Sequence, residues 1–110
     1  MIIKNYKTVK IFQIRNIADT MYAFRDFDEN RFNFNDYNCM FNGEVECEEA
    51  CCGDLATLES IWEVFNIDHP LNFHGHSLSV SDIVFVNNKY YYCQSMGWED
   101  ITKYCKVNMI

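Results

Sequence analysis

Proline and glycine are scarce in this chain. Its 110 residues include 1 proline and 4 glycines, and no tract rich in either separates one part of the sequence from another. No internal repeat or low-complexity segment interrupts it, and none of the glycines lies in a Walker or dinucleotide-binding pattern. We therefore expect a single domain over residues 1–110 that binds no nucleotide cofactor.

Long apolar runs are also absent. No window approaches the roughly 18 apolar residues of a membrane span, and residues 1–7 do not resemble a secretory signal. In a secreted chain of this size cysteines suggest disulfides, but without a signal a reducing compartment and free thiols are the better expectation. The sequence predicts a cytoplasmic protein whose six cysteines are thiols: Cys39, Cys47, Cys51, Cys52, Cys93 and Cys105.

Basic residues are few, and the acidic ones are unevenly spread. The formal net charge is -7. Residues 1–25 carry +4, residues 26–68 carry -11, and residues 69–110 are balanced. Binding to a phosphate backbone needs clustered Lys and Arg, so nucleic acid should be repelled by most of this surface. We expect a basic protein partner instead.

Apolar residues make up 49% of the chain, which is enough for a folded core, and residues 8–14 form the first expected strand. Val9 and Ile11 should lie on one face, with Phe12 and Ile14 on the other. Such a strand is either buried on both sides or bulged.

Two further elements are expected before residue 50. Asn16 and Asp19 have the spacing of a capping box and predict a short helix that continues to Arg25. The alternation in residues 37–48 predicts a hairpin with its tight turn at Asn42-Gly43. Its first strand should place three side chains on one face: Tyr37, Cys39 and Phe41.

The principal helix is expected at about residues 54–66. Asp54 follows a glycine as an N-cap, and Asn66 with the downstream Pro70 should end the helix. Its apolar stripe would contain Leu55, Leu58, Ile61, Trp62 and Phe65.

The last expected elements are two strands, at residues 83–86 and 90–93, joined by a tight turn at Asn87-Asn88, with Gly97-Trp98 turning the chain away. Together the segments predict an α+β fold: a small, mostly antiparallel sheet with one principal helix and a short N-terminal helix. A sheet that curls towards a small barrel is compatible with the same pattern.

Two clusters suggest metal or catalytic chemistry. Cys47, Cys51 and Cys52 lack the paired clusters of structural zinc sites, which favours ordinary thiols. His74 and His76 resemble a metal-ligand pair, but a loop whose imidazoles satisfy backbone groups is the simpler interpretation. No cysteine lies in a nucleophile motif. We therefore expect no catalytic residue, no metal and no cofactor.

The acidic segment is the remaining candidate for a binding site. Alternate carboxylates on a strand lie about 6.7 Å apart, twice the strand rise, and can partly imitate a phosphate backbone. A solvated face that only keeps the protein soluble is the competing interpretation. The predicted partner-binding residues are Glu44, Glu46, Glu48, Glu49, Asp54, Glu59 and Glu63. Two aromatic residues, Trp98 and Tyr90, are predicted to anchor the partner beside them.

Three strings of residues resemble the YodL-like domain, which occurs in proteins of conjugative and other mobile elements of Gram-positive bacteria. They are residues 65–70, residues 75–82 and the aromatic hairpin that ends at Gly97. The resemblance is strongest over residues 54–101, whereas the N-terminal strand and the loop 47–53 depart from it.

The resemblance implies no reaction, cofactor or catalytic residue, but it does imply a mobile-element context. Small acidic proteins of such elements protect incoming DNA from host nucleases. The resulting hypothesis is an anti-CRISPR or antirestriction protein that occupies the basic nucleic-acid channel of a defence nuclease. The alternative is an accessory or regulatory interaction domain of a plasmid transfer system.

Overall fold

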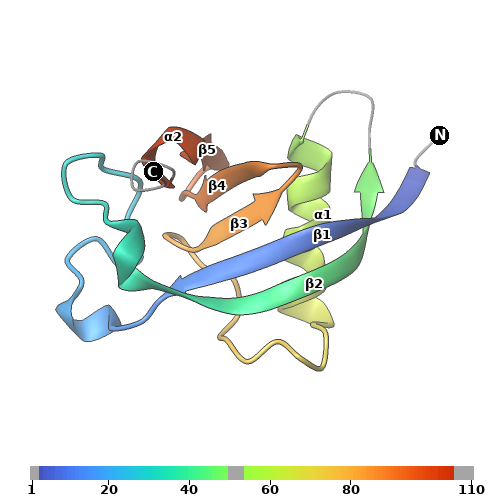
Figure 1. Ribbon diagram of the computed structural model, residues 1–110, viewed down its shortest axis with the longest axis horizontal. Coiled ribbons are helices and arrows are strands. Elements are labelled where there is room, and N and C mark those ends of the chain that lie inside the picture. The colour runs from blue at the N-terminus through green and yellow to red at the C-terminus, as the bar shows by residue number, and fades with distance from the viewer. Residues whose placement is uncertain (1–2, 50–53, 106–110) are drawn as a thin grey trace.

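The computed structural model describes residues 3–49 and 54–105 and is built on one antiparallel sheet (Figure 1). The strand order is β2-β1-β3-β4-β5, so β2 and β5 form the edges. The sheet is open and does not close into a barrel, and the expected α+β class is confirmed. The strands are β1 (Ile3–Ile14), β2 (Tyr37–Glu49), β3 (Ile83–Val86), β4 (Lys89–Cys93) and β5 (Trp98–Asp100).

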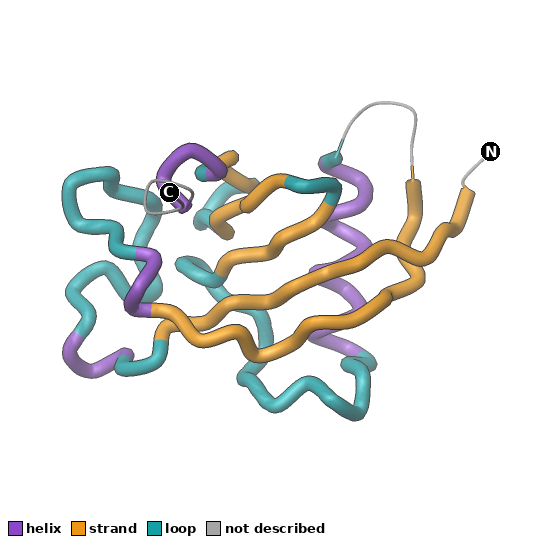
Figure 2. The backbone as a smooth tube through the Cα atoms, in the orientation of Figure 1, coloured by secondary structure: helices purple, strands orange, loops and turns teal. Residues whose placement is uncertain are grey.

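One long helix, α1 (Leu55–Ile67), crosses one face of the sheet (Figure 2). Leu55 at its start is 61% exposed, so the predicted apolar stripe begins too early. Thr57 is buried in its place. The remaining helices are short: η1 (Ile17–Asp19), η2 (Phe34–Asp36) and α2 (Thr102–Cys105).

The short N-terminal helix is a single 3₁₀ turn, η1, and does not continue to Arg25. Thr20 already has extended backbone angles, and Phe24 has a positive φ of 63°. The Asn16 side chain donates to the Asp19 carboxylate at 2.9 Å and caps no backbone N–H. The predicted capping box is therefore a bond between two side chains.

The first hydrophobic core lies between α1 and the sheet. It joins the face of β1 that carries Val9 and Ile11 to α1, and both of these residues are fully buried. The loop between α1 and β3 adds Phe73 and Leu78. Because only one side of α1 packs on the sheet, the apolar residues of this helix recur every 3–4 residues.

A second, aromatic core covers the opposite face of the sheet. Ile14 of β1 and Tyr92 of β4 are buried there beneath the segment 16–36 and α2. Phe12 packs edge-on against Phe34 with ring centroids 5.1 Å apart. The two-sided strand predicted for residues 8–14 is confirmed, because each of its faces meets a different core.

The predicted hairpin turn at Asn42-Gly43 is wrong. β2 continues through both residues and pairs with β1 from end to end, with Asn42 opposite Lys10 and Gly43 opposite Val9. A Cβ at position 43 would lie 3.0 Å from Cζ of Phe41, so the glycine leaves room for that ring. The glycine therefore serves side-chain packing within a strand.

An irregularity in β2 also breaks the predicted face of Tyr37, Cys39 and Phe41. The register with β1 shifts between Ile11 and Phe12, whose partners are Phe41 and Cys39. This β-bulge moves Phe41 into the core beneath α1, whereas Tyr37 joins the aromatic core.

The C-terminal strands follow the sequence more closely. Asn87 and Asn88 have positive φ angles of 53° and 67° and form the predicted tight turn between β3 and β4. Gly97, at φ 90°, then reverses the chain so that β5 pairs with β4. The sequence predicted a turn there but not the strand that follows it.

Candidate functional site: an acidic groove beside the edge strand

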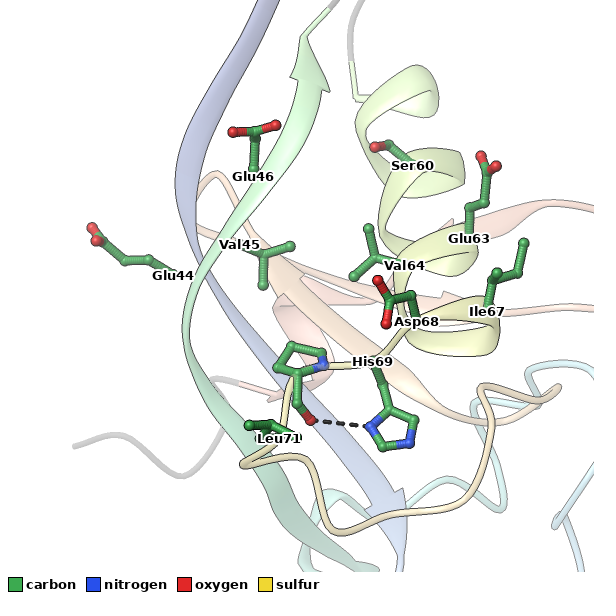
Figure 3. Close-up of a pocket in the computed structure, with 11 residues that line it drawn as sticks. Glu44, Val45, Glu46, Ser60, Glu63, Val64, Ile67, Asp68, His69 and Leu71 are labelled. Carbon is green, nitrogen blue, oxygen red and sulfur yellow. Dashed lines mark hydrogen bonds between the residues drawn. The ribbon is translucent and has the colours of Figure 1, made fainter.

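A groove of about 700 Å³ runs between β2 and α1 (Figure 3). One wall is β2 at residues 44–46, and the other wall is α1 between residues 60 and 67. Residues 68–71 border one end. Figure 3 shows Val45 pointing towards α1 and Val64 pointing back towards β2. Four acidic residues contribute to the lining of the groove: Glu44, Glu46, Glu63 and Asp68.

The alternation of β2 places its acidic side chains on the side away from the helix. Val45 is buried against the first core, so its neighbours Glu44 and Glu46 point to the opposite face of the sheet. Across β1 they pair with Thr8 and Tyr6, which are exposed. Both carboxylates are therefore open to solvent at the rim of the groove.

The helix wall combines charge with exposed apolar surface. Glu63 is exposed, and one turn later Ile67 is 77% exposed. Leu71, in the loop after α1, is 99% exposed. The neighbouring His69 ring nitrogen Nδ1 lies 3.0 Å from the carbonyl oxygen of Pro70 (Figure 3). The two large apolar side chains of Ile67 and Leu71 are thus exposed to solvent beside the acidic residues.

Three of the predicted binding residues, Glu44, Glu46 and Glu63, come together at this groove. Glu59 is exposed on α1 but does not line it. Glu48 and Glu49 lie at the end of β2, and their side chains fall outside the described part of the structure.

Asp54 and Trp98 are placed elsewhere. The Asp54 carboxylate accepts hydrogen bonds from the Tyr91 hydroxyl and from Asn87 Nδ2, the latter at 2.9 Å, so it does not cap α1. Trp98 is half-buried and packs edge-on against Trp62, with ring centroids 6.2 Å apart. Tyr90, also half-buried, packs at a tilt against Phe85, its partner across β3 and β4.

Sequence reasoning missed Asp68, Ile67 and Leu71 as groove residues. Each lies at or beyond the end of α1, in a segment that was interpreted as a helix stop and as part of the family resemblance but not as a binding surface. Asp68 belongs to the acidic block of residues 26–68, so its charge was visible, but its position beside β2 was not. Exposed Ile and Leu carry no signal in a sequence, because apolar residues are usually read as core.

Among the residues that the structure describes, no group of three or more His, Cys, Asp or Glu side chains is arranged so that it could hold a metal ion. His74 and His76 are exposed and border a smaller hollow of about 290 Å³. Cys39 is exposed, whereas burial raises the pKa of the Cys93 and Cys105 thiols to about 12. Cys51 and Cys52 lie outside the described residues, and so does the Cys47 side chain.

A buried polar cluster joins β1 to the segment that precedes β3. Gln13 Nε2 donates to Asp82 Oδ2 at 3.0 Å and to the His76 carbonyl at 2.8 Å. The Ser79 N–H donates to the same Asp82 oxygen at 2.9 Å. Burial raises the pKa of Asp82 to about 6, although these hydrogen bonds and the nearby His76 act in the other direction. The cluster fixes the loop that carries the two histidines.

Within the described ranges, no helix has the length and apolar character needed to cross a membrane. Comparison with curated proteins and with solved structures finds no match. A family model, described as the YodL-like domain, matches residues 8–104. The match therefore includes most of β1 and residues 47–53, where the sequence had suggested a departure from the family. Because it spans nearly the whole chain, this protein belongs to the YodL-like domain family.

Proposed function

We propose that this protein is a cytoplasmic, non-enzymatic binding protein that holds a basic segment of a partner protein in the groove between β2 and α1. The observation that carries the proposal is the composition of the groove. Acidic residues border it on both sides, with Glu63 and Asp68 on the helix side and the Glu44 and Glu46 carboxylates at the β2 rim, and the exposed Ile67 and Leu71 lie beside them. Interfaces that bind proteins combine such an apolar centre with a charged rim.

The charges and the apolar residues have different roles in this proposal. An Arg that becomes buried against one of the carboxylates contributes about 1.5–3 kcal/mol, whereas carboxylates that stay hydrated mainly raise the association rate. Contact with Ile67 and Leu71 removes apolar surface from water, which stabilises the complex at any salt concentration. Binding should therefore weaken with salt without disappearing.

The specific partner that we propose is a host defence nuclease of the CRISPR or restriction type. The protein would act for a mobile element by occupying the nuclease's basic nucleic-acid channel. Support comes from the net charge of -7 and from Glu44 and Glu46, which lie on one side of β2 at about 6.7 Å spacing. Duplex DNA carries one charge per about 3.4 Å of each strand, so the imitation concerns sign more than density.

A cleavage assay tests this partner. Guide-loaded CRISPR nucleases and restriction enzymes are each incubated with DNA, with and without the protein, at several salt concentrations. We expect salt-sensitive inhibition of one nuclease and its loss in the charge-reversed triple variant Glu44→Lys, Glu46→Lys, Glu48→Lys. A matched triple reversal at Asp19, Glu29 and Glu99, away from the groove, should still inhibit. Equal inhibition by two folded variants would refute mimicry by this segment.

A second candidate is an accessory domain of a plasmid transfer system, and the exposed apolar residues favour it. Imitation of a phosphate backbone makes no use of Ile67 or Leu71, which are 77% and 99% exposed, but an ordinary protein interface does. Affinity purification from a donor strain separates the two candidates. Recovery of relaxase or mobilisation proteins supports the transfer function, and recovery of a nuclease supports inhibition.

A further inference from the structure

The outer edge of β2 faces the groove. β2 is an edge strand of the sheet, and within residues 3–49 and 54–105 it pairs only with β1. Three consecutive residues, Glu44, Val45 and Glu46, line the groove although neighbouring side chains of a strand point to opposite faces. A groove can meet all three only along the strand's edge, where their backbone lies. The groove thus follows the line on which another strand would pair.

The two sides of this edge differ in chemistry. On the helix side, Val45 and Val64 point towards one another, while Glu63, Ile67 and Asp68 lie farther along the helix wall. On the opposite side lie Glu44 and Glu46. A strand laid against β2 would direct alternate side chains to these two sides. The set on the helix side would first meet Val45 and Val64, and the other set would meet the carboxylates of Glu44 and Glu46.

We infer that the groove takes an extended segment of alternating basic and apolar residues, which adds to the sheet as a strand beside β2. This inference rests on the proposed function and specifies the conformation and sequence pattern of the partner segment. Main-chain hydrogen bonds to β2 would supply affinity, and the alternating side chains would supply specificity. The lining from residue 44 to residue 46 is about 10 Å long at 3.3 Å per residue, so it pairs with about three residues of a longer extended segment.

Charge argues against a second copy of this chain as the occupant. Pairing of two β2 edges would bring Glu44 and Glu46 of one molecule towards those of another, which is unfavourable. The opposite edge strand, β5, carries Glu99 and Asp100, so it offers no basic side chain either. Acidic edges of this kind keep sheets from pairing with themselves, and here they select a basic strand.

The test uses a seven-residue peptide of alternating Lys and Val, capped at both ends. Its control contains the same residues in two blocks, so that charge is equal and alternation is lost. Binding is measured by calorimetry at low salt, and amide hydrogen exchange of the protein is followed by NMR at saturating peptide. We expect the alternating peptide to bind and to slow, by about tenfold or more, the exchange of those amides in residues 41–46 that point away from β1. The β5 amides should not change.

Two protein variants remove equal charge from different places. The groove variant is Glu44→Gln, Glu46→Gln, Glu63→Gln. The control variant is Asp28→Asn, Glu29→Gln, Glu99→Gln, whose residues line a separate hollow beside β5 and α2. We expect the groove variant to bind the alternating peptide about tenfold more weakly, since it loses up to three exposed ion pairs, and the control variant to bind normally.

The outcomes separate the two proposals. Strand addition is overturned if binding in the groove depends on charge but does not slow exchange in β2, or if both peptides bind with equal affinity. Either result leaves the proposed acidic binding site in place. Equal loss of affinity in the groove and control variants, or no binding at all, overturns the groove as a site for basic segments. Slower exchange in β2, together with weaker binding of the groove variant alone, supports both.

Discussion

Gln13 Nε2 lies 3.0 Å from Asp82 Oδ2, and both side chains are 98% removed from solvent. The pair connects the middle of the sheet to the loop before β3, 69 residues later in the chain. The Gln13 Oε1 atom is buried and has no hydrogen-bond partner among the residues that the structure describes. The contact is thus a buried polar contact with little space around it.

The first prediction is a pH dependence of stability. Burial raises the folded-state pKa of Asp82 to about 6, above its value of 3.8 in an unfolded chain. The folded state therefore holds the proton more tightly, and this stabilisation is full below about pH 4 and lost as the pH rises to about 6. The free energy of unfolding should fall by up to about 3 kcal/mol across this window.

Urea unfolding of the wild type and of Asp82→Asn between pH 4 and pH 7.5 tests this dependence. The asparagine oxygen can still accept from Gln13 and Ser79 but does not titrate, so the variant should lack this part of the decline. Asp28→Asn, at an exposed position, should behave as the wild type does. Parallel curves for the wild type and Asp82→Asn would contradict the prediction.

A methyl group at position 75 should destabilise the same polar contact. A Cβ built on Gly75 would lie 1.9 Å from Gln13 Oε1 and 2.9 Å from Cε1 of Phe73, which is also buried. Gly75→Ala should lower the free energy of unfolding by about 1–3 kcal/mol, as overpacked sites do. Ser77→Ala, on the exposed part of the loop, is the control. In a Gln13→Ala background the cost of Gly75→Ala should shrink, and an undiminished cost would place the clash elsewhere.

Asp54 should stabilise the protein through the sheet and not as a helix cap. Its carboxylate accepts from the Tyr91 hydroxyl and from Asn87, and no backbone N–H of α1 donates to it. Asp54→Ser keeps a capping side chain but is too short to reach Tyr91, so we expect it to cost about as much as Asp54→Ala, roughly 1–2 kcal/mol.

A double-mutant cycle with Tyr91→Phe measures the bond itself. Thermal or urea unfolding of the two single variants and the double variant should give a coupling energy of about 1 kcal/mol. A serine variant as stable as the wild type would instead restore the capping role that the sequence suggested.

Thiol reactivity should differ sharply among Cys39, Cys93 and Cys105. Cys39 is exposed, whereas the other two are buried and their pKa values are raised to about 12. At pH 8 iodoacetamide should label Cys39 and spare Cys93 and Cys105 in the folded protein, because the thiolate is the reactive form. Peptide mapping by mass spectrometry reads out the sites, with urea-unfolded protein as the control. Rapid native labelling of Cys93 or Cys105 would indicate an activated thiol and reopen the question of catalysis.

The local parts of the fold were predictable because their causes are local. Asn87-Asn88 tolerates the left-handed angles of a tight turn, and a period of 3–4 in residues 54–66 predicts a helix that buries one side. The strand at residues 8–14 showed its two apolar faces directly. The family was also recognisable, because the strings at residues 65–70 and 75–82 are long and uncommon.

The partner of each strand was decided only in the tertiary structure. Asn42-Gly43 is a strong local signal for a hairpin turn, yet pairing with β1 along 12 residues outweighs it, since a continuous ladder satisfies more backbone groups than a short hairpin does. The bulge opposite Ile11 and Phe12 likewise depends on fitting two cores on two faces. Neither event can be read from residues 37–48 alone.

Some features of the candidate site were likewise determined by the sequence, and others only by the tertiary structure. The sequence determined that residues 26–68 are acidic and that the alternate carboxylates of β2 share a side. It could not determine that Glu63 and Asp68 approach β2, that Asp54 is bound to Tyr91, or that Ile67 and Leu71 remain in water, because each depends on where α1 packs across the sheet. Charge is a property of composition, whereas a groove is made by elements that are far apart in sequence and meet only in the folded chain.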